Sequence, residues 1–133
     1  MKKILIVLSV LALNGCAVYD AYMMTGFDNN EYLLITQIRT DAGQYKNMCE
    51  TPLAEVNATQ IAYKTKLFAN YSQEIPRNDN VKSASKNLDD IAEGLVQQYK
   101  KETKVSSLFC KLKYTAIENS ATVIQHVVGS RPR

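Results

Sequence analysis

The chain has 133 residues, a formal net charge of +3, and 22% charged and 46% hydrophobic residues. This length allows one small domain, and the few glycines and prolines favour a folded chain over a low-complexity linker. The balance of charge gives no strong basic stripe, so we expect no nucleic-acid partner.

A positive region and an apolar run open the sequence. Lys2 and Lys3 precede the mainly apolar residues 4–13. Ten residues of helix span roughly 15 Å, about half the hydrocarbon thickness of a bilayer, so the run is too short for a resident membrane helix. This layout is typical of a cleavable export signal.

The end of the apolar run reads Leu13-Asn14-Gly15-Cys16. It resembles the lipobox of bacterial lipoproteins, although Asn14 is less usual at its position than Ala or Ser. The resemblance implies that residues 1–15 are a signal peptide and that the thiol of Cys16 is acylated after cleavage. Two or more acyl chains would give stable membrane anchoring. The alternative is an ordinary secretory signal with a chance cysteine.

The residue after the cysteine bears on location. In Gram-negative lipoproteins an Asp at this position tends to retain the protein at the inner membrane, whereas this chain has Ala17. The resemblance therefore implies an outer-membrane anchor facing the periplasm. Loss of Lys2 and Lys3 with the signal would lower the formal net charge from +3 to +1.

The mature chain begins with an expected tether, residues 16–28, and a first helix over 29–43. Asp28 or Asn29 can cap this helix. Gly43 is a plausible stop. Its apolar positions recur at helical spacing: Leu33, Leu34, Ile35, Ile38 and Ala42.

Thr51-Pro52 predicts the start of a second helix over 52–73, with Thr51 as the cap and Pro52 in the first turn. Pro76 prevents its continuation. The apolar positions assigned to its buried side are Leu53, Val56, Ile61, Tyr63, Leu67, Phe68 and Tyr71.

The third helix is expected over 80–102, capped by Asn78 or Asp79, and the fourth over 104–128, with Gly129 as its C-terminal cap. The buried side of the third helix is predicted at Val81, Ala84, Leu88, Ile91, Ala92, Leu95 and Tyr99. That of the fourth is predicted at Val105, Leu108, Phe109, Leu112, Ala116, Val123 and Val127. Residues 130–133 read as a short exposed tail.

Helical periodicity dominates after the tether, and no stretch alternates with period two over more than a few residues. The fold class predicted is all-α: an antiparallel up-down bundle of about four helices in one domain, residues 29–129. A rival arrangement has three long helices with the first displaced onto the side.

Cys49 and Cys110 form an even pair once Cys16 is acylated. In an antiparallel bundle the loop with Cys49 and the start of the fourth helix lie at the same end, which makes a disulfide possible. An exported protein meets an oxidising compartment, so we expect the bond. It would close a loop of about 60 residues and contribute roughly 4 kcal/mol. The alternative is two buried free thiols.

Catalytic signals are weak. The single histidine, His126, reads as a packed or half-exposed side chain, and Asp89 and Glu93 read as a solvated surface. No H-E-x-x-H motif, no G-x-S-x-G motif and no glycine-rich phosphate loop occurs. We therefore expect no enzyme, no cofactor, no metal and no small-molecule substrate.

The most polarised feature is a group of lysines around the connection between the third and fourth helices, with Glu102 as the only acid among them. It reads first as a solvated bundle end with lysines near a helix C-terminus. The alternative is a docking patch for an acidic envelope protein or anionic wall polymer. We expect it to point away from the anchoring membrane. Its members are Lys100, Lys101, Lys104, Lys111 and Lys113.

These observations favour a membrane-anchored envelope lipoprotein that acts by binding another envelope protein or the wall. The alternative is a phage-encoded lipoprotein, acting in lysis as a spanin-like subunit or in superinfection exclusion. Outer spanin subunits are usually Pro-rich, and this chain has three prolines. A wall-degrading enzyme is the third hypothesis, supported only by isolated carboxylates.

Overall fold

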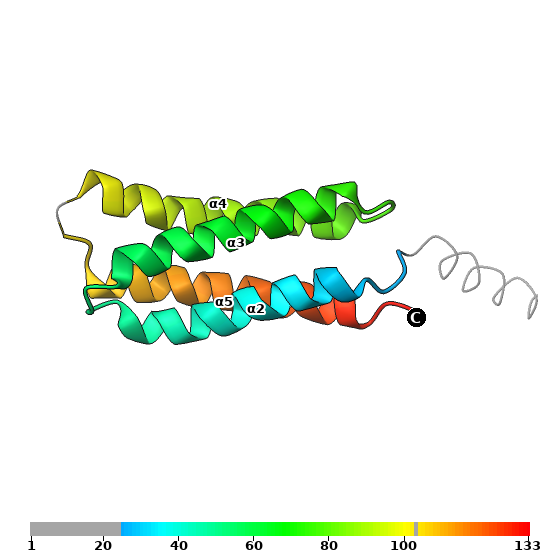
Figure 1. The fold of residues 1–133 in the computed structure, drawn as a ribbon, viewed down its shortest axis with the longest axis horizontal. Helices are drawn as coiled ribbons and strands as arrows, with labels where there is room; N and C mark the ends of the chain where they lie inside the picture. The colour runs from blue at the N-terminus through cyan, green and yellow to red at the C-terminus, as the bar shows by residue number, and fades with distance from the viewer. Residues whose placement is uncertain (1–24, 103) are drawn as a thin grey trace, which may run out of the picture.

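The structure is a computed structural model that describes residues 25–102 and 104–133. Within these ranges the chain is helical and contains no strand (Figure 1). The elements are α2 (Asn29–Tyr45), the 3-10 helix η1 (Lys46–Met48), α3 (Ala54–Glu74), α4 (Asp79–Lys101) and α5 (Ser107–Gly129). The predicted signal peptide and the lipidation site Cys16 lie outside the described residues.

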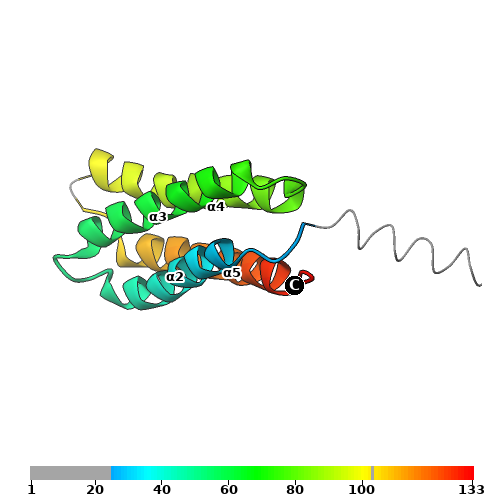
Figure 2. The same ribbon diagram turned by 45° about the vertical axis from the view of Figure 1, so that its right-hand side comes forward.

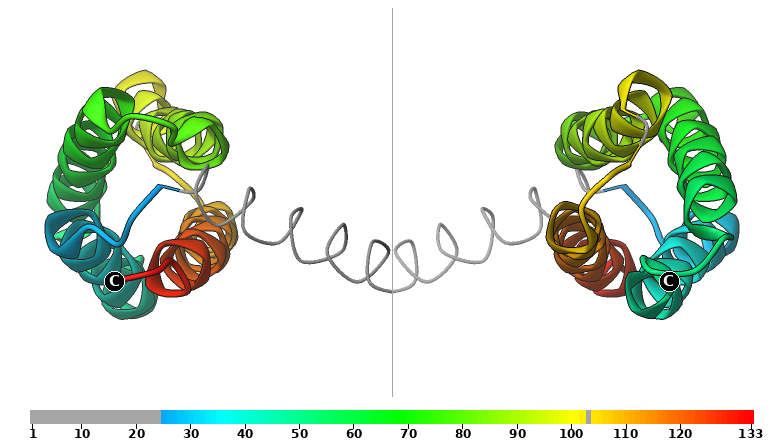
Figure 3. Two further views of the ribbon diagram at one scale, coloured as in Figure 1. Left: turned by 90° about the vertical axis from the view of Figure 1, so that its right-hand side faces the viewer. Right: turned by 90° about the vertical axis from the view of Figure 1, so that its left-hand side faces the viewer.

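The four α-helices of the described chain form an antiparallel bundle, which confirms the predicted fold class (Figures 1 and 2). Helix α2 packs against α3 and α5, and α4 packs against the same two helices. The views along the bundle therefore show α3 and α5 at diagonally opposite corners (Figure 3). The rival arrangement with a displaced first helix is wrong.

Local signals explain some helix ends and not others. The Asp28 carboxylate accepts a hydrogen bond from the Glu31 N–H at 2.7 Å and caps α2 as predicted. The predicted cap at Thr51 is wrong, because α3 begins at Ala54, and the Thr51 hydroxyl instead donates to the Met48 carbonyl at 2.8 Å. Helix α5 starts later than predicted, since Ser106 supplies its cap.

The core of α2 and α4 follows the prediction closely. Ile35, Ile38 and Ala42 of α2 are fully or almost fully buried, as are Val81, Leu88, Ala92 and Leu95 of α4. Asp89 was expected at the surface and is instead buried. It accepts a hydrogen bond from the Thr65 hydroxyl at 3.1 Å, and the Lys66 ammonium lies 3.2 Å from its other oxygen. A buried carboxylate needs such partners.

The predicted buried sides of α3 and α5 are largely wrong. Leu53, which directly precedes α3, and Val56, Tyr63 and Leu67 within it are exposed. On α5 the exposed large apolar residues are Leu108, Leu112, Val123 and Val127. The core side of α3 is built mainly from small and polar residues: Ala54, Asn57, Ala58, Ile61, Ala62, Thr65, Phe68, Ala69 and Ser72. The core side of α5 consists of Cys110, Tyr114, Ile117, Ala121, Ile124, Gln125 and Val128.

A buried polar cluster joins all four helices at the end where α2 begins. The Glu31 carboxylate receives hydrogen bonds from Arg131 at 2.5 Å, Asn78 at 2.7 Å and Ser72 at 3.0 Å. Asn78 precedes α4, but its side chain makes no capping bond, because its amide is used in this cluster. The prediction that residues 130–133 form an exposed tail is wrong for Arg131, which is 8% exposed.

Candidate interaction surfaces

The first surface is the α3 outer face, which we define as Leu53, Val56, Tyr63 and Leu67. These residues and Gln60 are spaced by three and four positions in alternation, which is the spacing of a heptad seam. All are exposed, and Tyr63 is 70% exposed. At about 100° per residue they fall within a quarter of the helix circumference. Helix α3 therefore presents exposed apolar side chains along one side, interrupted by Gln60, whose side-chain oxygen accepts a hydrogen bond from the Tyr45 hydroxyl at 2.9 Å.

The second surface is the α5 outer face, defined as Leu108, Leu112, Val123 and Val127. Their exposed fractions run from 40% to 68%. They lie on the side of α5 opposite its core residues, so α5 is apolar on two sides. Among the helices described, none is long and apolar enough to cross a membrane.

The segment before α2 is fixed across the end of the bundle. The Phe27 N–H donates to the Pro132 carbonyl at 2.9 Å, and the Arg133 guanidinium lies 4.8 Å from the centre of the Phe27 ring. The Thr25 hydroxyl donates to the Pro76 carbonyl at 3.0 Å. The position at which the described chain begins is therefore set by the ends of α3 and α5.

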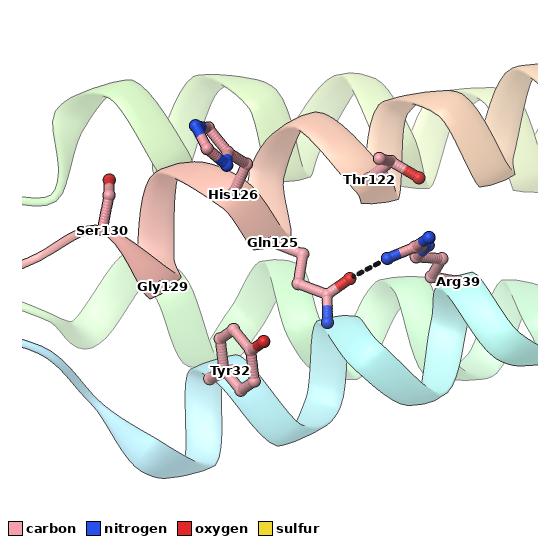
Figure 4. A pocket seen from close by; sticks show the side chains of 7 residues that line it. All are labelled: Tyr32, Arg39, Thr122, Gln125, His126, Gly129 and Ser130. Atoms are coloured by element: carbon pink, nitrogen blue, oxygen red, sulfur yellow. Dashed lines mark hydrogen bonds between the residues drawn. The ribbon is translucent and has the colours of Figure 1, made fainter.

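A shallow groove of about 390 Å³ lies between α2 and α5 (Figure 4). Gln125 bridges the two helices, because its oxygen accepts from Arg39 at 2.9 Å and its amide donates to Thr36 at 2.8 Å. His126 also lines the groove, is exposed, and points away from the Arg39–Gln125 pair. Arg39, Gln125 and Thr36 in and beside the groove are hydrogen-bonded to one another, so these polar side chains serve first to hold α2 against α5.

The lysines singled out from the sequence lie at the opposite end of the bundle. Lys111 approaches the Glu50 carboxylate at 3.2 Å, and the Ser107 hydroxyl donates to the same oxygen at 2.8 Å. The hydrogen bond from Ser107, which has the larger effect, and the contact with Lys111 hold the pKa of Glu50 below its usual value. Glu50 lies in the loop between η1 and α3, so the sequence alone does not place it beside these lysines.

Acidic side chains therefore accompany the lysines. Lys104 lines an open groove together with Glu50, Glu55 and Glu102. Lys100 and Lys101 are exposed at the end of α4, and Lys113 lies 5.5 Å from the centre of the Phe109 ring. The fold thus brings two further acids to a region where the sequence showed only Glu102. A docking patch for an acidic partner stays a prediction.

The predicted cysteine pair lies at this same end. Cys49 and Cys110 form a disulfide with their Cα atoms 5.9 Å apart. The bond joins the loop after η1 to the first turn of α5. Tyr114 follows one turn later and is fully buried, with its ring 6.0 Å from that of Tyr45. Burial, and after it the neighbouring Tyr99 and Tyr45, raises the pKa of Tyr114 well above its usual value.

Within residues 25–102 and 104–133, no group of three or more His, Cys, Asp or Glu side chains is arranged to hold a metal ion. Comparison with protein-family models, with curated proteins and with solved structures found no match to this chain. Its function must therefore be argued from its own residues, and the two outer faces are its most distinctive surfaces.

Proposed function

We propose that this chain is a membrane-anchored envelope lipoprotein that acts by binding another envelope component and not by catalysis. The lipobox-like residues Leu13-Asn14-Gly15-Cys16 support the anchor. The disulfide between Cys49 and Cys110 fits an exported domain, because such bonds persist in oxidising compartments.

The observation that carries the binding role is the α3 outer face. Large apolar side chains are exposed along about 21 Å of helix, from Leu53 to Leu67, and no other described helix covers them. A group of large exposed apolar side chains on one side of a helix is typical of an interaction site on a small domain. The heptad spacing fits an amphipathic helix of a partner protein, whose apolar side chains would pack between those of α3.

Tyr63 is the expected energetic centre of this surface. It lies in the middle of the seam, with Val56 before it and Leu67 after it, and Tyr is enriched among residues that dominate binding energy. Truncation of Tyr63 to Ala should therefore weaken partner binding by roughly tenfold or more. Asp90, exposed on α4, offers a matched control because its truncation leaves the α3 outer face intact.

Site-specific photo-crosslinking in intact cells tests the proposal. A photoreactive amino acid placed at Tyr63 or at Leu67 should give the same protein adduct, identified by mass spectrometry, whereas the same probe at Asp90 should not. Absence of an adduct at both α3 positions, or equal adducts at all three, would contradict the proposal.

A further inference from the structure

The α5 outer face differs from the α3 outer face in its charges. Within α5 the charged residues are Lys111, Lys113 and Glu118. Glu118 is directed to the start of η1, where its carboxylate lies 2.6 Å from the Lys46 ammonium. No carboxylate of α5 itself therefore accompanies the aliphatic side chains of the α5 outer face. Lys111 and Lys113 lie near its first turns, where Lys111 also contacts the exposed carboxylate of Glu50 at 3.2 Å. An apolar face accompanied by lysines suits the surface of an anionic bilayer.

The described chain begins beside one end of this face. Thr25 lines an open groove together with His126 and Val127, so the chain enters the bundle on the side where the α5 outer face ends. The hydrogen bonds of Thr25 and Phe27 hold this position. Helix α3, which carries the α3 outer face, lies at the corner of the bundle diagonally opposite α5 (Figure 3).

The chain between Cys16 and Thr25 is short. Residues 17–24 can span at most about 28 Å even when fully extended, whereas α5 itself is about 35 Å long. An anchor at Cys16 would therefore keep the Val127 end of α5 close to the lipid. Such tethering raises the effective concentration of the membrane surface at the α5 outer face, so even weak contact would be well populated.

We propose that the α5 outer face lies on the phospholipid surface of the membrane that holds Cys16, an inference that rests on the anchor in the proposed function. Leu108, Leu112, Val123 and Val127 enter the interface between head groups and acyl chains, and Lys111 and Lys113 lie at the level of the lipid phosphates. The bundle then lies flat, and the α3 outer face, on the diagonal, points away from the membrane toward a partner.

The absence of tryptophan from the sequence makes this orientation measurable. The chain from Cys16 onward carries one thiol outside the Cys49–Cys110 disulfide, and that thiol can be coupled to a maleimide-bearing phospholipid in vesicles containing anionic lipid. This chemical tether replaces biological acylation. The result therefore tests the orientation even if acylation of Cys16 fails in cells, which would overturn only the proposed function.

Three single-tryptophan variants are compared: Leu112→Trp and Val123→Trp on α5, and Leu67→Trp on α3 as the matched control. Lipid brominated near the head-group end of its acyl chains should quench the two α5 probes roughly twofold or more, because the face enters the outer part of the bilayer. The α3 probe should keep its intensity. Circular dichroism checks that all three variants keep the helical fold.

Two results would overturn the proposal. One is equal or absent quenching at all three positions. The other is a blue-shifted emission of the α5 probes without quenching by brominated lipid, which would mean that a second copy of the chain covers the α5 outer face.

Discussion

Arg131 and Glu31, 100 residues apart in the sequence, form a buried ion pair in which Nη1 of the arginine lies 2.5 Å from Oε2 of the glutamate. Arg131 also donates to Asn78 at 2.5 Å, so one side chain ties the chain after α5 to the starts of α2 and α4. Removal of one partner from a buried ion pair leaves an uncompensated charge.

Arg131→Met should therefore lower the free energy of unfolding by about 3 kcal/mol or more. Urea unfolding followed by circular dichroism measures this loss. Lys86→Met is the matched control, because Lys86 pairs with Asp90 on the exposed side of α4 and such pairs contribute little. Equal losses in the two variants would contradict the role given to Arg131.

The disulfide should contribute strongly to stability. Cys49 and Cys110 are 61 residues apart, and the chain-entropy treatment gives roughly 4 kcal/mol for a loop of this size. The variant with both cysteines replaced by Ala should lose up to this amount in chemical unfolding. Mass spectrometry of the non-reduced protein should find the two peptides linked. Free reaction of both thiols with an alkylating agent under native conditions would show that the bond is absent.

Helix number, order and direction follow from the sequence because the breaks in the helical repeat lie close to the observed helix ends. The predicted stop at Gly43 is nevertheless wrong, since α2 continues to Tyr45. Asp28, Pro76 and Gly129 all lie at or next to helix ends. The disulfide follows from the same topology, since alternating helices bring the loop with Cys49 beside the first turn of α5.

The sequence does not show which side of α3 and of α5 is buried, because both helices carry apolar residues on two sides. Large residues such as Leu67 and Leu112 suggest the core, yet on α3 the core side contains Ala58, Ala62 and Ala69. Small side chains let neighbouring helices approach closely, so residue size alone selects the wrong side. The role of Arg131 was missed for another reason: its partner Glu31 is distant in the sequence, and no local pattern connects the two.

Tyr114 should make the fold sensitive to alkaline pH. An unfolded tyrosine titrates near pH 10, whereas burial raises the pKa of Tyr114 in the folded protein. Because the folded state holds the proton more tightly, this contribution to stability is complete below about pH 10 and falls as the pH rises above it. Tyr114→Phe should flatten the decline in unfolding free energy between about pH 9 and 11. Tyr63→Phe, at an exposed position, should leave it unchanged.

Replacement of Gly129 and of Gly94 by alanine should change the stability of the fold in opposite directions. A Cβ at Gly129 would lie 2.9 Å from Cε2 of the Tyr32 ring, so Gly129→Ala should cost about 1 kcal/mol in stability. A Cβ at Gly94 would meet only the Lys113 ammonium at an ordinary 3.5 Å, so Gly94→Ala should add roughly 0.5–1 kcal/mol within α4. Thermal unfolding measures both, and a change of the same sign in the two variants would contradict the packing around Tyr32.

Anchoring through Cys16 is the claim on which the proposed role depends, and metabolic labelling with a palmitate analogue tests it most directly. The wild-type precursor should become labelled, and mass spectrometry should find a mature chain that begins at an acylated Cys16. The Cys16→Ser variant should remain unlabelled and keep residues 1–15, whereas Cys49→Ser should label normally. Persistent label in Cys16→Ser, or a mature wild-type chain that begins at another residue, would contradict the account.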